Sequence, residues 1–231
     1  ALAAKQTYKI IYVAPERLTL EGFQQLCASV PISLLAVDEA HCVSQWGQDF
    51  RPSYLRISAF LETLPVRPVV GAFTATATVT VRKDITELLG LHAPLTITTG
   101  FDRPNLSFHV RQPKDRMAEL LQIIRERPGR CGIVYCATRR TTEEVCQHLQ
   151  AAGFQAQCYH AGLPDEQRRK TQEDFVFDRC PIMVATNAFG MGIDKSNVSF
   201  VIHYNMPKNL ESYYQEAGRA GRDGAPAECI L

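Results

Sequence analysis

Two adjacent carboxylates follow a continuously apolar run in the string L-L-A-V-D-E-A-H at residues 34–41. An apolar run that ends in Asp38 and Glu39 is typical of a buried strand with acids at its C-terminal tip. We predict that Asp38 holds a Mg²⁺ ion that arrives with ATP, mostly through water, because Mg²⁺ keeps much of its hydration shell. Glu39 is then placed to orient or deprotonate an attacking water, and His41 to link the site to the other lobe or to the arginine-containing string at residues 215–224. The plainer alternative is a solvated acidic pair in a turn, which the full string disfavours.

Two arginines stand among glycines in Q-E-A-G-R-A-G-R-D-G at residues 215–224. A guanidinium suits phosphate because its planar fork donates two hydrogen bonds and stays charged. We therefore assign Arg222 as an arginine finger, which neutralises charge on a γ-phosphate, and Arg219 as a second phosphate contact. Gln215 is assigned to the same catalytic motif. A glycine-rich turn with surface arginines is the alternative.

Two further strings follow apolar runs and carry small or polar residues. A-F-T-A-T-A-T at residues 72–78 offers hydroxyls, and together with the D-E-A-H string it indicates a relay between ATP and DNA, with Thr76 as a DNA-binding residue. A threonine-rich helix cap is the simpler interpretation of that string alone. The string V-A-T-N-A-F-G-M-G-I-D-K at residues 184–195 contains Gly192, which permits close backbone approach, and Asp194, which could meet ribose hydroxyls of the nucleotide. Glycine-rich loops are common turns, so this last string is weak by itself.

The residues of these four strings can act together only if the strands that precede them end at the same edge of a sheet. The hydrophobic pattern of the sequence predicts such strands. Short apolar runs alternate with helical patterns, which indicates parallel sheets built from strand–helix–strand crossovers. We expect strands at residues 9–13, 33–37, 68–73, 95–98, 132–136, 155–159, 182–185 and 200–204. We expect helices at residues 17–29, 52–64, 78–89, 116–127, 140–152, 164–177 and 210–217.

A polar stretch with two prolines, residues 99–114, interrupts this alternation and is typical of a linker. The predicted fold class is therefore α/β, with two lobes of similar build at residues 1–108 and 109–231. Each lobe is expected to be a mostly parallel sheet with helices on both faces. Ligands of such sheets bind beyond the carboxyl ends of the strands. We expect the nucleotide in the seam between the lobes, with acids on one side and guanidiniums on the other.

Composition and charge narrow the class of protein. Lys and Arg total 25 against 24 Asp and Glu, so the net charge by itself does not indicate DNA binding. If the protein binds DNA, it needs a local basic groove, for which residues 139–140 and 168–170 are candidates. A solvated helix face is the alternative for both runs. No apolar run reaches eighteen residues, so we expect no membrane span. The eight cysteines form no C-x-x-C pair and show no zinc-ligand spacing, which favours free thiols in a reducing cytosol and no metal site among them.

Taken together, the four strings resemble the superfamily-2 helicases, and one more stretch narrows the resemblance to the RecQ family. S-Q-W-G-Q-D-F-R-P at residues 44–52 looks like the aromatic-rich loop with which that family senses single-stranded DNA. Trp46 and Phe50 offer flat faces for base stacking, and Arg51 offers a cation. A core position is the alternative for Trp46, which its polar neighbours disfavour. The strings Y-V-A-P-E-R-L, F-D-R-P-N-L, I-V-Y-C and Y-H-A-G-L also have the family's look.

The resemblance implies two RecA-like lobes and an ATP-dependent 3′→5′ DNA helicase acting in repair and recombination, with ATP and Mg²⁺ as cofactors. Its partners would be single-stranded and duplex DNA, with no membrane, and it indicates no protein partner. Its location would be cytoplasmic, at the nucleoid, or nuclear in a eukaryote. By the same resemblance, the residues near the DNA backbone in the second lobe are Thr138, His160, Ala161 and Thr186.

The family's phosphate-binding loop, G-x-x-x-x-G-K-[ST], does not occur in the 231 residues. We expect it upstream of Ala1, which would leave the first lobe truncated at its N-terminus and this fragment inactive alone. The zinc-binding and winged-helix regions of many RecQ proteins would lie beyond Leu231, so Cys229 is not interpreted as a zinc ligand. Two alternatives stay open: a nucleic-acid-binding or scaffolding module without catalysis, and a superfamily-2 RNA helicase.

Overall fold

The computed structural model describes residues 5, 7–47, 50–100, 102–190, 193 and 195–231. The chain divides into two compact units, Ala1–Thr99 and Gly100–Leu231. This division falls before the predicted boundary between residues 108 and 109. The reason is that strand β3 (Leu106–His109) pairs with a strand near the end of the chain and so belongs to the second unit.

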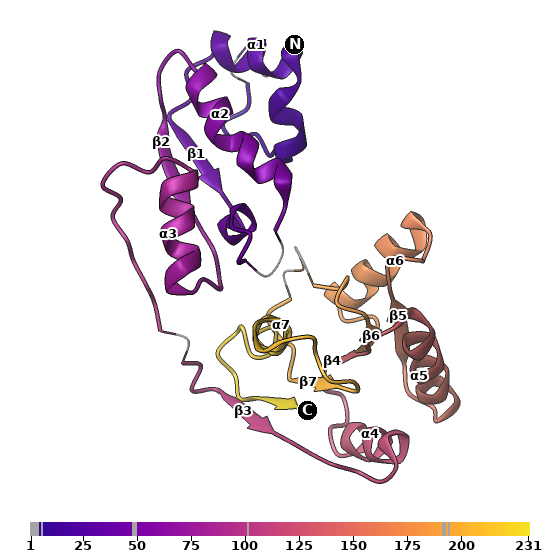
Figure 1. The fold of residues 1–231 in the computed structure, drawn as a ribbon. Coiled ribbons are helices and arrows are strands. Elements are labelled where there is room, and N and C mark those ends of the chain that lie inside the picture. The colour runs from indigo at the N-terminus through magenta and orange to yellow at the C-terminus, as the bar shows by residue number, and fades with distance from the viewer. Residues whose placement is uncertain (1–4, 6, 48–49, 101, 191–192, 194) are drawn as a thin grey trace. The chain divides into compact units, whose positions relative to one another are not determined.

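The first unit contains a two-stranded parallel sheet (Figure 1). Strand β1 (Leu34–Val37) pairs with β2 (Val69–Ala72), so that Val37 lies opposite Ala72. Its α-helices are α1 (Glu21–Ser29), α2 (Arg56–Thr63) and α3 (Val79–Leu88), and its 3-10 turns are Pro15–Thr19, Ala40–Val43 and Pro52–Leu55. One apolar core joins these elements, and its members include Leu18, Cys27, Val37, Val43, Ile57, Phe60, Leu61, Val81, Ile85 and Leu89.

The local sequence determines where helix α3 begins and which of its faces is buried. The side-chain oxygen of Thr78 accepts a hydrogen bond from the backbone N–H of Val81 at 3.3 Å, which caps the first turn. Val81, Ile85 and Leu89 are spaced by four residues and are all buried against the core. The threonine-rich string therefore does serve as a helix cap, through Thr78.

Two predicted strands of the first unit are wrong. Residues 9–13 and 95–98 have no strand partner among the described residues, and they are irregular. Ile10 and Ile97 are 71% and 77% exposed, respectively. The reason is that a run of β-forming residues becomes a strand only where a neighbouring strand pairs with its N–H and C=O groups.

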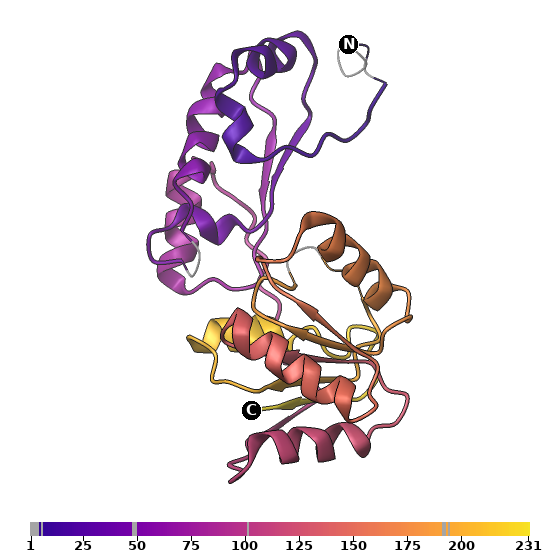
Figure 2. The same cartoon turned by 90° about the vertical axis from the view of Figure 1, so that its right-hand side faces the viewer.

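The second unit is built on a six-stranded sheet in which every pairing is parallel (Figures 1 and 2). The strand order is β3-β8-β7-β4-β6-β5. The other strands are β4 (Gly132–Tyr135), β5 (Ala156–Tyr159), β6 (Ile182–Ala185), β7 (Phe200–His203) and β8 (Ala227–Ile230). The helices are α4 (Arg116–Arg125), α5 (Arg139–Ala151), α6 (Asp165–Val176) and α7 (Leu210–Ala217).

Helices cover both faces of this sheet, because successive strand residues point to opposite sides. Val134 packs in the core that Leu120 of α4 and Leu149 of α5 complete. Its neighbour Ile133 packs in the opposite core with Phe175 of α6 and Ala217 of α7. A fully buried side chain of leucine or phenylalanine size stabilises the fold by roughly 1.5–3 kcal/mol, so the two cores fix the sheet that carries the site.

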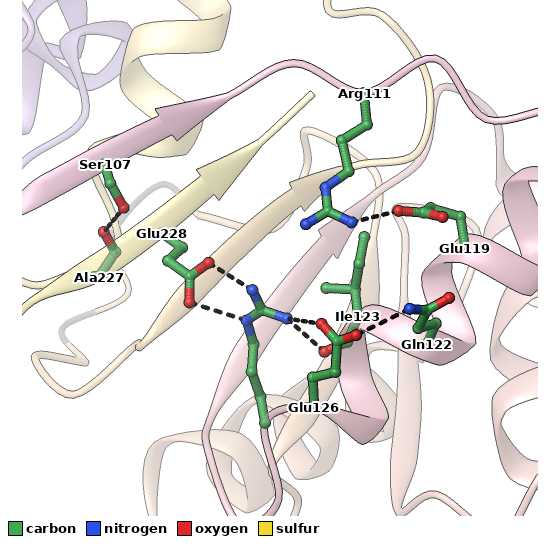
Figure 3. Close-up of polar contacts among 9 residues, drawn as sticks. Ser107, Arg111, Glu119, Gln122, Ile123, Glu126, Ala227 and Glu228 are labelled. Atoms are coloured by element: carbon green, nitrogen blue, oxygen red, sulfur yellow. Dashed lines mark hydrogen bonds and ion pairs between the residues drawn. The ribbon is translucent and has the colours of Figure 1, made fainter.

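Strands β3 and β8 were not predicted from the sequence. Leu106–His109 lies in the stretch interpreted as a linker, and Ala227–Ile230 is only four residues long. An ion pair fixes β8 to the turn that follows helix α4: the guanidinium of Arg127 donates two hydrogen bonds to the Glu228 carboxylate, at 3.1 and 2.5 Å. Figure 3 shows Glu228 on its strand beside Ser107 and Ala227. These bonds hold the pKa of Glu228 below its ordinary value of 4.5.

The predicted α/β fold class with parallel sheets is confirmed.

All eight cysteines are free thiols, and seven of them are buried. In the described part of the chain, no helix has the length and apolar character that a membrane crossing requires. No group of three or more histidine, cysteine, aspartate or glutamate side chains with metal-binding geometry occurs among those residues either.

Candidate active site

The acidic pair stands directly after β1, as predicted. Asp38 is exposed, and its Oδ1 accepts a hydrogen bond from the Glu39 backbone N–H at 2.9 Å. Glu39 adopts left-handed backbone geometry with φ at 49°, which is strained for a residue with a side chain. Hydrogen bonds between Phe73 and its neighbours Val37 and Ala40 hold this turn against the end of β2.

The environment of the two carboxylates fits a hydrated Mg²⁺ ion. Glu39 Oε2 is buried and forms no hydrogen bond to a described residue. Asp38 presents an exposed carboxylate of which one oxygen is oriented by a single backbone amide. Carboxylate oxygens that keep open positions are the ligands with which Mg²⁺ and its water shell bind.

His41 connects the acidic pair to the threonine-rich string. Its side chain is buried, and Nδ1 lies 3.3 Å from Glu39 Oε2 and 2.9 Å from Thr74 Oγ1. The Thr74 hydroxyl donates to the carbonyl of Thr76 at 3.0 Å, so its oxygen is left to accept from the imidazole. The sequence indicated a relay through this string as a whole, with Thr76 as a DNA-binding residue, and within the string the contact to His41 is made by Thr74. Which of several hydroxyls meets the imidazole depends on the turn after β2, and the string alone does not specify it.

The aromatic-rich loop begins beside His41. Trp46 is 77% exposed, so the alternative of a core position is wrong. Its backbone N–H donates to Ser44 Oγ at 3.1 Å, and Ser44 Oγ donates to Asp84 of α3. A Cβ at Gly47 would overlap the carbonyl of His41, so the loop lies in close contact with the histidine backbone.

The rest of this loop is only partly described. Phe50 and Arg51 are half-buried, and the Arg51 backbone N–H donates to the carbonyl of Cys42 at 2.9 Å, which returns the loop to the turn after the acidic pair. Gln48 and Asp49 lie outside the described residues. The exposed Trp46 ring is therefore attached to a segment that is hydrogen-bonded at both ends.

The predicted DNA-contacting residues of the second unit all follow strands that are neighbours in the sheet. Thr186 and His160 come directly after β6 and β5, and the Thr186 N–H donates to the Tyr159 carbonyl. Thr138 caps α5 just after β4, where its Oγ1 accepts from the Thr141 N–H at 3.1 Å. His160 is buried, whereas Ala161 and Thr138 are exposed. Because parallel strands end at one edge, these residues are brought together there.

The two arginines bind the loop that follows β6. Arg219 donates to the carbonyl of Gly190, and Arg222 donates to the carbonyl of Ile193 at 3.1 Å. Gly190 has φ at 146°, and a Cβ there would overlap the Arg219 guanidinium. The glycine-rich loop and the arginine string are therefore in contact. Gly192 and Asp194 lie outside the described residues.

Helix α7, which carries Gln215, is held to the C-terminal end of β7 by a hydrogen bond between two side chains. Glu216 Oε2 lies 2.8 Å from Nε2 of His203, the last residue of β7. The His203 ring stacks on Tyr135, whose hydroxyl donates to the Phe189 carbonyl at 3.0 Å. Burial raises the pKa of Tyr135, and the nearby Arg219 guanidinium opposes this shift. Gln215 itself is half-buried.

Sequence reasoning missed several residues of this region. His203 and Glu216 were not singled out, and Thr74 was quoted without a role. Arg103 and Asn105 stood in the quoted string F-D-R-P-N-L, yet no chemistry was assigned to them. The available signal was an arginine and an asparagine beside a proline in a stretch otherwise interpreted as a linker, where a charged fork and an amide suggest bonds to backbone carbonyls.

Comparison with known proteins supports one family. Residues 1–85 match the DEAD/DEAH box helicase model, and residues 115–224 match the helicase conserved C-terminal domain. The chain is 46% identical over 224 residues to the ATP-dependent DNA helicase RecQ of Bacillus subtilis, and 44% identical over 225 residues to that of Pasteurella multocida. These alignments cover 97% of this chain but 38% and 35% of the two relatives, respectively.

A solved structure shares the fold. The yeast protein Dbp5 of S. cerevisiae, bound to RNA and ADP BeF3, matches with a TM-score of 0.71 at 22% identity. The match covers 92% of this chain and 56% of that structure. With family models matching both units and identity above 40% along nearly the whole chain, this protein belongs to the RecQ-type helicases of superfamily 2, of whose helicase core it forms a part.

Proposed function

We propose that this chain is the nucleotide-hydrolysing and DNA-coupled part of a 3′→5′ DNA helicase that acts in repair and recombination. The observation that carries the proposal is the position of His41. Its imidazole lies beside the Glu39 carboxylate and the Thr74 hydroxyl, and its backbone carbonyl contacts the loop that presents Trp46. One residue therefore contacts the acids that serve hydrolysis and the segment that serves DNA.

In the hydrolytic step, Asp38 would hold the Mg²⁺ that accompanies ATP, and the ion supplies charge neutralisation at the transferred phosphoryl group. Glu39 orients the attacking water and accepts its proton. The Oε2 atom of Glu39 is buried and lies 3.3 Å from His41 Nδ1, so the imidazole can orient the carboxylate that accepts this proton. Arg219 and Arg222 supply guanidiniums that neutralise charge developing on the phosphate oxygens.

In the coupling step, DNA bases stack on the exposed Trp46 ring, and the strand's backbone lies along the sheet edge of the second unit. Base stacking on an aromatic ring is worth about 1–3 kcal/mol per base, enough to shift the loop that carries Trp46. A shift of that loop moves the backbone of His41, and with it the hydrogen bond to Thr74. DNA binding thereby adjusts the position of Glu39.

The chain spans well under half the length of the RecQ relatives that it matches, and its 231 residues contain no G-x-x-x-x-G-K-[ST] string. Without the amides and lysine of such a loop, ATP phosphates lack their main binding groups. We therefore expect these 231 residues alone to hydrolyse ATP negligibly. Turnover equal to that of the full-length gene product would contradict this expectation.

The decisive experiment is DNA-stimulated ATP hydrolysis by the full-length gene product and its Glu39→Gln variant. Because a general base contributes 10²–10⁴-fold, we expect a loss of about 10²-fold or more in turnover with ATP binding retained. Glu62→Gln, which changes an exposed carboxylate of α2, is the matched control and should leave turnover unchanged. Equal turnover of the Glu39→Gln and parental proteins would overturn the assigned role.

Two further measurements separate the alternatives. A protein that binds single-stranded DNA but never hydrolyses ATP in the full-length form would be a binding or scaffolding module. Stimulation by RNA in place of DNA would instead identify an RNA helicase, although the stacking loop with Trp46 favours DNA. Unwinding of a duplex with a 3′ tail, but not of one with a 5′ tail, tests the proposed polarity.

A further inference from the structure

The string F-D-R-P-N-L at residues 101–106 makes direct contact with the arginine loop, which we define as residues 218–224. The guanidinium of Arg103 donates to three backbone carbonyls of this loop. The distances are 3.4 Å to Gly218, 3.1 Å to Ala220 and 2.8 Å to Gly221. More than a hundred residues of sequence separate Arg103 from these acceptors, so the contact is a product of the tertiary fold.

Asn105 holds the same loop from a second position. Its Nδ2 donates to the carbonyls of Gly221 at 2.8 Å and Ala225 at 2.9 Å. Its own backbone carbonyl accepts from the N–H of Ala227, where β8 begins. The amide therefore fixes the end of the arginine loop to the edge strands of the sheet.

The carbonyls that Arg103 binds lie in the irregular turn that follows helix α7, whose C-cap is Gly218. Backbone carbonyls in such a turn have no regular ladder of partners, so a side chain that donates to them fixes the turn. A half-buried arginine reaches several of them at once, because its planar fork donates in fixed directions. Hydrogen bonds from a charged donor are also stronger than neutral ones.

The fit between this string and the loop is close. Gly221 has φ at 57°, a backbone conformation that favours glycine. A Cβ at Gly221 would lie 2.5 Å from Asn105 Nδ2 and 2.8 Å from the Ala225 carbonyl. Asn105 thus approaches the loop at a distance that only a glycine at position 221 allows.

We propose that Arg103 and Asn105 are positioning residues for the two phosphate-binding arginines, an inference that rests on the proposed function. The Gly218 carbonyl belongs to the peptide that leads into Arg219, and the Gly221 carbonyl to the peptide that leads into Arg222. Arg103 binds both of these carbonyls, so it fixes the backbone from which each guanidinium projects. The string acts on ATP hydrolysis through the arginines and does not touch the nucleotide.

The test is ATP hydrolysis by the full-length gene product carrying Arg103→Lys or Asn105→Ser. Lysine keeps the charge but has no fork to reach three carbonyls, and serine loses the bridging amide. Because a displacement of about 1 Å can cost 10²-fold, we expect kcat to fall by up to about 10²-fold while KM for ATP changes little. If Arg103→Lys does not fold, Asn105→Ser decides the question.

Ser107→Ala is the matched control. Ser107 lies on β3 and donates to the Ala227 carbonyl at 3.3 Å, so it joins the same two strands without touching the arginine loop (Figure 3). We expect this variant to keep the parental kcat. An equal loss of kcat in Ser107→Ala and in the Arg103→Lys or Asn105→Ser variants would overturn the proposal, because the effect would then come from the strand pair.

A double-mutant cycle with Arg222→Ala distinguishes this inference from the proposed function. If Arg103 acts through the arginines, Arg103→Lys should lower kcat far less in the Arg222→Ala background than in the parental one. Full additivity would overturn the positioning role. A parental kcat in the Arg222→Ala variant would instead contradict the role of Arg222 as the arginine finger in the proposed function. A lowered kcat in Arg222→Ala, with parental kcat in both Arg103→Lys and Asn105→Ser, would sink only the present inference.

Discussion

His41 Nδ1 lies 2.9 Å from Thr74 Oγ1, and this contact joins the D-E-A-H string to the T-A-T-A-T string within one unit. The two strings follow neighbouring parallel strands, β1 and β2, which end at the same edge of their sheet. In the proposed function, hydrolysis and the response to DNA share this hydrogen bond, which can be removed without changing either carboxylate.

Thr74→Val removes that bond while keeping the shape of the side chain. We expect DNA stimulation of ATP hydrolysis by the full-length gene product to fall by about five- to tenfold, since one hydrogen bond to a buried group is worth about 1–1.5 kcal/mol. Basal hydrolysis should change less. Thr63→Val, which removes a hydroxyl that donates to the Phe60 carbonyl at the end of α2, is the control. Equal stimulation of the Thr74→Val and parental proteins would show that the contact does not couple the strings.

Trp46→Ala removes the exposed ring on which bases are proposed to stack. We expect weaker binding of single-stranded DNA, by about 1–3 kcal/mol, and loss of most DNA stimulation with basal hydrolysis kept. Phe177→Ala, which removes another ring that is 64% exposed, serves as the control for general loss of surface aromatic area. Fluorescence titration with an oligonucleotide and steady-state kinetics measure the two effects. A Trp46→Ala variant with parental stimulation would contradict the coupling role.

Gly190→Ala places a methyl group where the Arg219 guanidinium lies, at a backbone φ of 146°. We expect turnover to fall about as far as in Arg219→Ala, together with a stability loss of about 1–3 kcal/mol from the strained backbone. Gly153→Ala is the control, since Gly153 also has a positive φ of 87° but no atom within 4 Å of its Cβ position. That variant should lose stability and keep turnover. Thermal unfolding and ATP hydrolysis, measured on both variants, separate strain from displacement.

Glu228→Gln should reduce stability in a pH-dependent way. The bond from Arg127 holds the folded-state pKa of Glu228 below its ordinary value of 4.5. The pair therefore contributes fully above about pH 4.5, and its contribution disappears as pH falls through the lower folded-state pKa. Because 34% of the Glu228 side chain is exposed, solvent screens the pair and we expect only about 1 kcal/mol at neutral pH.

The measurement is the difference in melting temperature between the parental chain and Glu228→Gln from pH 7 down to pH 3. The difference should shrink as the carboxylate becomes protonated in both states. Glu144→Gln, which breaks an exposed pair with Arg140 on α5, should produce a smaller difference at neutral pH. A difference for Glu228→Gln that grows toward low pH would show that the pair does not behave as described.

The sequence by itself determined the fold class, the polar strings and their placement after strands. Strand β6 and helix α7 have the bounds that were predicted, because a short apolar run and a capped amphipathic run are local signals. Asp38, Thr138, His160 and Thr186 follow strands for the same reason. Residue types at fixed spacing also indicate a chemistry, so roles for the acids and the arginines could be predicted without a structure.

Only the tertiary structure decided which of these groups meet. Strands β3 and β8 pair although they lie near opposite ends of the second unit's sequence. Residues 9–13 form an equally apolar run, yet they have no strand partner among the described residues. Two further contacts depend likewise on segments that are distant in the sequence. His41 contacts Thr74 rather than Thr76, and Arg103 donates hydrogen bonds to the arginine loop. Hydrogen bonds need atoms within about 3.5 Å at defined angles. Local patterns fix the direction of a side chain, but folding alone brings its partner within that distance.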